Sequence, residues 1–442
     1  MRLRFGFLSL ATVAATAAAG PAPAAAQQPA GAPDTVRLDA LQSAAVNRDP
    51  RGRQVELLAS QSALRLRGLR SEWLPRLNVG AQAQYQSAVA SVPAELTGGT
   101  SPAPPHKDTY DAYLGVRQPL YDPTLGARRG AEAAELAQSQ ARVRTSLYTL
   151  RQAVADAYFS VLLLDAQSAE LQAGVTDLDA QLRVARERVA GGDALPSAAV
   201  TLEAELLRRR QSLAELASDR RATLAVLADL AGRPIGEQAV LAVPELAADV
   251  ARARAAIDGT NRRPEYVQFA RTRDALERQR EVIDRRDWPR LSAIGRAGLG
   301  RPGLNPLSRD FTGYWLAGVQ VEWSPWDWGQ ASRERESLAI QQEIVTTEET
   351  AFTEQLRRAA VRDLADIDRL AQDLGTDDTI IALRERVLGE TRLRFGEGVV
   401  TSAEYVDRET DLLSARLARA AHRVELAQAR ARLLTLVGLE VH

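Results

Sequence analysis

The chain has 442 residues and a formal net charge of −1, with 26% charged and only 5% aromatic residues. This balance of charge gives no basic field that would attract nucleic acid, so we expect no nucleic-acid partner. The absence of cysteine excludes disulfides, thiolate catalysis and lipid attachment through an N-terminal cysteine. The three histidines are scattered, so we expect neither a metal site nor a cofactor.

The first residues have the pattern of a secretory signal. Two arginines precede an apolar segment from Phe5 to about Ala19, and the alanines from Ala24 to Ala26 offer an A-x-A cleavage site. Residues 1–26 are therefore predicted to be a signal peptide, and the mature chain is predicted to be exported. The alternative is a disordered tail rich in alanine and proline.

Two stretches of the chain share one plan. RVAGGDALPSAAV begins at Arg188, and RFGEGVVTSAEYV begins 206 residues later at Arg394. In both, a long helical pattern breaks at a Gly-rich turn and at once begins again. The alignment continues without a gap to Gly232 and Gly438. A self-similar chain of this kind is predicted to contain the same helical hairpin twice.

The repeats divide the mature chain into three parts. Each repeat has a helix, a β-hairpin, a long helix, a tip and a return helix, and a linker region joins them. The predicted ranges are 27–233 for the first repeat with its tip at about 190–197, 234–263 for the linker, and 264–442 for the second repeat with its tip at about 396–402.

Helical patterns fill most of this plan. The first runs from Asp34 to about Trp73, where Pro75 disfavours continuation. The second long helix has an apolar residue every seven positions, which favours coiled packing between neighbouring helices. This ladder consists of Ile367, Leu374, Ile381, Leu388 and Phe395.

Four segments alternate apolar and polar residues, as strands with two different faces do. They form two β-hairpins, at about 75–120 and 289–323. A Pro- and Gly-rich loop at 92–106 divides the first, and the last strand is predicted from Phe311 to Trp323.

The strands indicate a membrane. Each has about ten residues, near the length that a tilted strand needs to cross a bilayer, whereas no apolar run is long enough for a membrane helix. Four strands cannot close a barrel, and open edges are not tolerated in hydrocarbon, so two chains would supply eight strands or three would supply twelve. The alternative is a small sheet in a soluble periplasmic protein. Four tryptophans favour the membrane because such residues collect at its interfaces: Trp315, Trp323, Trp326 and Trp328.

The repeated plan, the two tip sequences and the strand exits Leu120-Tyr121-Asp122 and Trp326-Asp327-Trp328-Gly329 together resemble the TolC-type outer-membrane efflux proteins. The resemblance covers nearly all of the mature chain. It implies a mainly α chain with membrane β-strands, in a homotrimer whose twelve-stranded β-barrel lies in outer-membrane lipid. Long helical hairpins would continue that barrel as a periplasmic α-barrel. It also implies docking to a periplasmic adaptor that is linked to an inner-membrane pump.

The resemblance assigns the tips to adaptor docking. In that family the glycine and the small and apolar residues after it meet the adaptor. The alternative is that the glycines only turn the chain, since glycine adopts positive φ freely. The matching positions are Gly192, Ala194, Leu195 and Ser197 in the first tip, and Gly398, Val400, Thr401 and Ser402 in the second.

The resemblance also implies acidic residues that ring the periplasmic mouth, and Glu404 and Asp407 occupy the matching positions. Three copies would form a negative ring that favours cations. Thr401 to Glu404 is also a capping box, which is a second explanation for Glu404. The equivalent positions in the first tip are Ala198 and Thr201, so only the second hairpin would supply the ring.

No catalytic motif stands out, and we predict that the protein is not an enzyme. The leading function is a passive outer-membrane exit duct for small molecules or drugs. Type I protein secretion and metal-ion efflux are alternatives within that function. A periplasmic coiled-coil scaffold without a pore is the alternative of another class. The chain itself names neither the cargo nor the partner pump.

Overall fold

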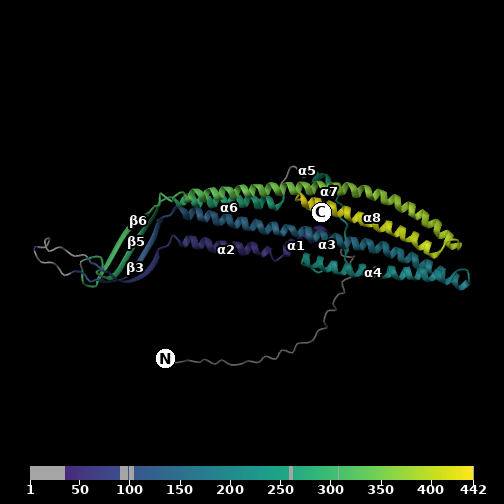
Figure 1. The fold of residues 1–442 in the computed structure, drawn as a ribbon, viewed down its shortest axis with the longest axis horizontal. Helices are drawn as coiled ribbons and strands as arrows, with labels where there is room; N and C mark the ends of the chain where they lie inside the picture. Colours follow the sequence, from purple (N-terminus) through teal and green to yellow (C-terminus); the bar gives the residue numbers. More distant parts are fainter. Residues whose placement is uncertain (1–34, 90–97, 99–103, 258–261, 307, 442) are drawn as a thin grey trace, which may run out of the picture.

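The computed structural model describes residues 35–89, 98, 104–257, 262–306 and 308–441. The predicted signal peptide and part of the predicted loop at 92–106 lie outside these residues. The molecule is elongated, with a β-sheet at one end and two helical tips at the other (Figure 1).

Two long helices run most of the length of the molecule. Helix α3 (Pro123–Gly191) has 69 residues and α7 (Gln330–Gly396) has 67, so each spans about 100 Å at 1.5 Å per residue. Each turns at a tip and returns, as α4 (Pro196–Ala231) and α8 (Ser402–Leu436) respectively. In the half of the molecule that ends at the tips, these four helices form one layer in the order α4, α3, α8, α7.

Shorter helices complete the half next to the sheet. Helix α2 (Gly52–Ser71) packs on α3, and α6 (Pro264–Arg286) packs between α3 and α7. Helix α6 begins where α8 ends, because Gly438 lies against Arg262 and Arg263. None of the described helices is both long and apolar enough to span a bilayer.

The four predicted two-faced strands are confirmed. They form an antiparallel sheet in the order β2 (Arg76–Tyr85), β3 (Asp108–Tyr121), β5 (Arg290–Arg301) and β6 (Thr312–Glu322). Strand β6 ends one residue before the predicted end. Within the described residues, the outer edges of β2 and β6 have no partner strand.

The register gathers the apolar residues on one face of the sheet. Val79 lies opposite Leu114, Leu114 opposite Ala297, and Ala297 opposite Trp315. We call this side the apolar face. Because side chains alternate along a strand, the other side carries Asn78, Gln82, Asp111, Arg296 and Tyr314 and is called the polar face.

The continuous helix predicted from Asp34 to Trp73 is wrong. The chain forms β1 (Thr35–Val36), α1 (Leu38–Arg48) and, after a break, α2. Pro50 disfavours helical geometry at Asp49, whose ψ is 129°. The linker, for which the sequence predicts no element, contains β4 (Val240–Leu241) and α5 (Ala247–Ala256).

These short elements form a layer at the middle of the molecule. Strand β1 pairs with β4, and the hydroxyl of the buried Tyr158 on α3 donates to the carbonyl oxygen of Val36 at 2.9 Å or to that of Ala242 at 2.5 Å. Burial raises the pKa of Tyr158. Helices α1, α3, α4, α5, α7 and α8 share this core. A second core lies near the tips and contains Leu182, Leu206, Phe395 and Tyr405.

The repeat is visible in the backbone. Gly232 and Gly438, 206 residues apart, have φ values of 61° and 77° and end α4 and α8 in the same left-handed turn. The seven-residue ladder also lies on the packed side of α7: Ile367, Leu388 and Phe395 are buried, and Leu374 and Ile381 pack against the two cores.

Candidate functional site

The two tips have the same geometry. Gly192 and Gly398 have φ values of 84° and 76°, which a residue with a Cβ rarely adopts. In the first tip the amide of Asp193 donates to the carbonyl of Arg188 at 2.8 Å, and in the second Val399 donates to Arg394 at 2.9 Å. Both long helices thus end in a Schellman turn.

The tips differ in which side chains they expose. Leu195 is 73% exposed in the first tip and Val399 is 70% exposed in the second. Of the predicted docking residues, Val400 is half-buried against the tip core and Ser402 is buried. Ser197 and Thr401 are exposed, and Ala194 is half-buried.

Val399 was missed at the sequence level. The repeat aligns it with the polar Asp193, so the comparison of the two tips gave it no weight. The signal was present in the paired valines that follow Gly398, since a helix that resumes at Ser402 can bury only one of them.

Glu404 and Asp407 lie one turn apart at the start of α8. The hydroxyl oxygen of Thr401 accepts a hydrogen bond from the amide of Glu404 at 3.2 Å, so the N-cap half of the capping box is present. Among the described residues, neither carboxylate has a hydrogen bond or an ion pair, and both are exposed. Their charges are therefore available to ions near the tip.

Side chains also tie the two hairpins together near the tips. Arg392 on α7 forms an ion pair with Asp177 on α3, and the hydroxyl of Tyr405 on α8 donates to the same carboxylate at 3.3 Å. Tyr405 is fully buried, and burial raises its pKa to about 12.

A buried ionic cluster lies farther along the hairpins. Arg209 on α4 is 3% exposed and forms ion pairs with Glu205 on its own helix and with Glu409 on α8. Gly174 makes room for this arginine, since a Cβ there would come within 2.9 Å of its guanidinium. Arg209 and Arg208 together hold the pKa of Glu205 below its ordinary value, although its burial opposes this.

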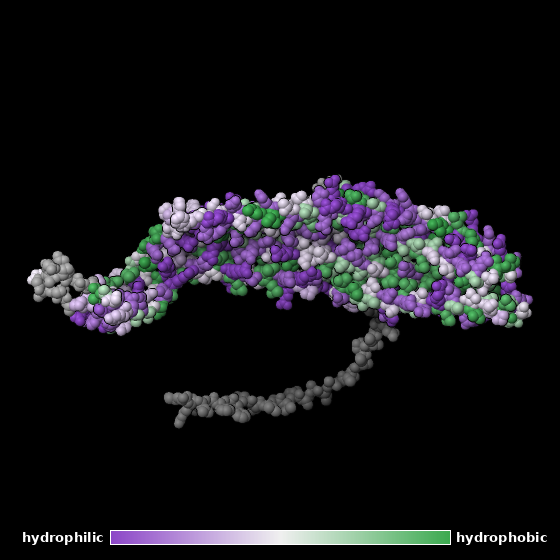
Figure 2. Space-filling view, in the orientation of Figure 1, coloured by the Kyte–Doolittle hydropathy of each residue, from purple (hydrophilic) through white to green (hydrophobic). Residues whose placement is uncertain are grey.

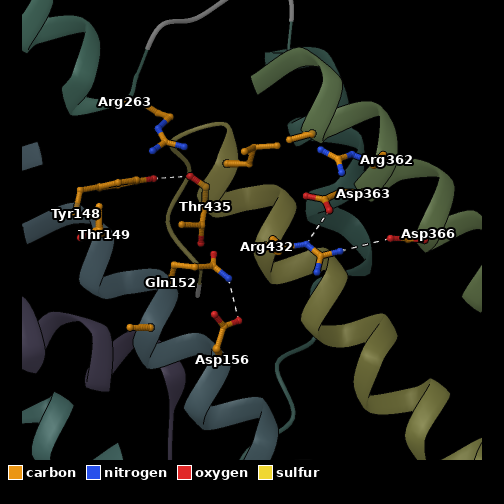
Figure 3. Close-up of a pocket in the computed structure, with 13 residues that line it drawn as sticks. Tyr148, Thr149, Gln152, Asp156, Arg263, Arg362, Asp363, Asp366, Arg432 and Thr435 are labelled. Atoms are coloured by element: carbon orange, nitrogen blue, oxygen red, sulfur yellow. Dashed lines mark hydrogen bonds and ion pairs between the residues drawn. The ribbon is translucent and has the colours of Figure 1, made fainter. Parts of the chain in front are cut away.

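A cavity of about 810 Å³ lies between α3, α7 and α8 at the level of the middle layer. Its side chains point toward one another in Figure 3. Arg432 pairs with Asp363 at 2.7 Å and with Asp366 at 3.6 Å, and the hydroxyl of Tyr148 donates to the carbonyl of Thr435 at 2.6 Å. Burial raises the pKa of Asp363, against the pull of Arg432.

No residue of α5 lines this cavity. Arg357 and Ala360 of α7 lie beside Ala256 at the end of α5, whereas the cavity uses Arg362 and Asp366, which project from other sides of α7. The helical layer therefore has one side covered by α5 and another that is open and charged. Figure 2 shows hydrophilic surface spread along the helices, with hydrophobic patches between.

The polar face of the sheet carries matched charges at its far end. Arg296 on β5 pairs with Asp111 on β3 and lies over the ring of Tyr113 at 3.5 Å. Arg301 also pairs with Asp108, but the register puts Arg301 opposite Tyr110 and therefore on the side of the apolar face. The polar face can therefore line an aqueous passage, while the apolar face can meet lipid.

The four tryptophans lie on or just after β6. Trp315 is on the apolar face, the indole of Trp323 donates to the carbonyl of Asp287 at 3.0 Å, and the rings of Trp326 and Trp328 meet edge to face at 5.8 Å. All four are exposed. Trp328 has a φ of 57°, so the exit turn holds it in a conformation that is costly for a bulky residue.

The sequence and the fold were compared with those of known proteins. Residues 40–233 match the model of the family described as outer membrane efflux protein. Over that part of its length the chain is similar to this family, whose members are transport channels and not enzymes. No curated protein sequence matches the chain.

Several solved structures share the fold of this chain. A membrane protein from Pseudomonas aeruginosa is 17% identical with a TM-score of 0.67, and the alignment covers 92% of this chain and 91% of that one. The outer membrane protein VceC of Vibrio cholerae is 15% identical, with a TM-score of 0.63 and coverage of 92% and 97%. The open state of the MtrE outer membrane channel of Neisseria gonorrhoeae is 19% identical, with a TM-score of 0.62 and coverage of 92% and 89%.

Proposed function

We propose that this protein is the outer-membrane channel of a tripartite system and works as a homotrimer. The open edges of its sheet carry the proposal. In the described part of the chain, strands β2 and β6 each have an unpaired edge, which hydrocarbon does not tolerate, and three copies would close twelve strands into a barrel. The apolar face and the exposed tryptophans would then meet lipid and its interfaces.

The helical layer supports the same assembly. The helices at the two sides of this layer, α4 and α7, expose large apolar side chains. Leu207 and Val226 lie on α4, and Val361 and Leu393 lie on α7. A second chain placed with its α4 against this α7 would cover both sets, and three such contacts would close a helical tunnel below the barrel.

The tips would meet the partners. Leu195 and Val399 are exposed apolar side chains at the ends of rigid hairpins, and such residues at the centre of an interface contribute most of its affinity. We propose that they dock a periplasmic adaptor which couples the channel to an inner-membrane pump. Small molecules or drugs are the proposed cargo, because the open side of the helical layer is polar and the described residues contain no cluster of side chains that could hold a metal ion.

Measurement of ion conductance across planar bilayers tests this proposal. The purified full chain, reconstituted in planar bilayers, is expected to form long-lived channels and to run as a trimer that dissociates on heating. A monomer that stays in water and conducts nothing would instead identify a periplasmic scaffold without a pore. Deletion of the gene should increase sensitivity to toxic small molecules and leave protein secretion unchanged.

A further inference from the structure

A second charged cavity lies at the base of the sheet, where the strands meet α2, α3 and α6. Its volume is about 350 Å³. The strand residues that line it belong to the polar face. Five arginines and three carboxylates surround it, a formal excess of two positive charges per chain: Arg76, Arg117, Arg128, Arg286 and Arg290 against Glu72, Asp122 and Glu322.

The register places two of these arginines directly opposite each other. Arg76 of β2 is the cross-strand partner of Arg117 of β3. Like charges in this position destabilise a sheet, because the two side chains project side by side from the same face. A carboxylate between the two guanidinium groups would remove this penalty.

The carboxylates around the cavity are engaged elsewhere. Glu72 forms a two-pronged contact with Arg128 at 2.6 and 2.9 Å and is 4.0 Å from Arg76. The carboxylate of Asp122 caps α3 by accepting from the amide of Thr124 at 2.9 Å. Within the described residues, Arg117 has no ion pair.

The two other arginines of the cavity, Arg290 and Arg286, also form no ion pair with its carboxylates in the described part of the chain. Arg290 lies opposite Glu322 in the register, yet no ion pair joins them in the part of the chain that the structure describes. Arg286 pairs at 2.9 Å with Glu334, which lies outside the cavity. Within the described residues Arg117 and Arg290 therefore have no ion pair, and Arg76 has only the 4.0 Å contact with Glu72.

The far end of the same polar face shows what a purely structural arrangement looks like. There Arg296 of β5 has Asp111 of the neighbouring β3 as its partner. At the base of the sheet, Arg117 has no such partner among the described residues, and Arg76 has only the 4.0 Å contact with Glu72.

We infer that this cavity is an anion-binding site, which takes a carboxylate, sulfonate or phosphate group of a passing molecule. Guanidinium groups bind such groups through two parallel hydrogen bonds, and two guanidinium groups side by side suit a polyanionic or multidentate group. The inference rests on the trimeric channel proposed above, in which three copies would form a cationic ring at the base of the barrel. The positive charge of this ring would be opposite in sign to the charge of Glu404 and Asp407 at the tips.

The test is calorimetric titration of the detergent-purified full chain with inorganic pyrophosphate. Arg117→Gln and, separately, Arg76→Gln are expected to weaken binding by about fivefold, the scale of one partly exposed charge contact. Arg117→Lys, which keeps the charge, should lie between. Arg252→Gln is the matched control, because Arg252 is an exposed arginine on α5 with its own partner, Asp249.

The outcomes are distinct. No binding to the unchanged protein, or equal binding by the Arg117→Gln and Arg252→Gln variants, would overturn the inference. Loss of the like-charge contact should leave thermal stability unchanged or slightly higher, so a variant that misfolds would also contradict it. Because binding is measured without conductance, a failure of the proposed channel function would be seen separately, in the bilayer experiment.

Discussion

Arg188, in the last turn of α3, donates a hydrogen bond from its guanidinium to the backbone carbonyl of Phe395, in the last turn of α7, at 2.8 Å. This contact joins the two tips of one chain. Gly398 lies beside it, and a Cβ at that position would be 3.2 Å from the same guanidinium. The second tip is therefore constrained by its backbone conformation and by its neighbour.

Gly398→Ala should destabilise the tip by about 1 kcal/mol, because alanine is strained at a φ of 76° and its methyl group would press on Arg188. Gly396→Ala is the matched control, since Gly396 is helical and has open space at its Cβ position. That change should be neutral or stabilising. Thermal unfolding followed by circular dichroism compares the two, and an equal loss in both variants would contradict the strain argument.

Arg209→Met should destabilise the hairpins by about 3 kcal/mol or more, since it leaves the buried carboxylates of Glu205 and Glu409 without their shared cation. Arg208→Met is the control. Arg208 contacts the same Glu205 but is 66% exposed, so its loss should cost less than about 1 kcal/mol. Denaturant unfolding of both variants gives the difference, and similar costs would show that burial is unimportant here.

The raised pKa of Tyr405 predicts a loss of stability in alkali. The neutral phenol is favoured in the folded state, where its pKa is about 12, compared with an ordinary value of 10.0. This contribution is complete below pH 10 and is lost as the pH rises toward 12. Tyr405→Phe should therefore flatten the decline in the free energy of unfolding over this interval. The buried Tyr158 contributes a decline of its own, so the variant should retain part of the slope.

The features that could be predicted from the sequence are those with a local pattern. Strict alternation identifies the four strands and their two faces, because a register shift of one residue would turn every apolar side chain to the wrong side. The glycines at the tips are visible in the repeat because only glycine suits their positive φ. The break at Asp49 and Pro50 was overlooked because α1 and α2 continue the same apolar pattern.

The contacts between hairpins could not be predicted in this way. Asp177 and Arg392 are 215 positions apart, and nothing in either helix indicates which of several charged residues will face the other. The opposition of Arg76 and Arg117 likewise depends on the pairing of β2 with β3, across a loop whose length sets the register. Long-range pairing of surface charges has no periodic signature, so the structure was needed for it.

Asp407→Asn should weaken block of the channel by a trivalent cation such as hexaamminecobalt, by about threefold or more, since each trimer of the proposed channel would lose three negative charges near its mouth. Asp193→Asn is the control, because Asp193 is an exposed acid on the other tip. Glu404→Gln should act in the same direction if its charge serves the mouth. An unchanged blocking constant in the Asp407 variant, measured with the cation on the tip side, would count against the acidic ring.

Val399→Asp should abolish export and leave trimers intact. The side chain is 70% exposed, so a carboxylate there has water around it in the free channel and costs little stability. In a docked tip the same carboxylate would be buried without a partner, which is expensive. Val399→Thr, which keeps the size and adds no charge, should retain most of the export. Val400 suits this test less well, because it packs against the tip core and its replacement would also disturb the fold.

Two measurements separate docking from folding. One is growth of a deletion strain on toxic small molecules, and the other is heat-dependent trimer dissociation of the purified variants. Normal export by Val399→Asp would remove this tip from the docking surface.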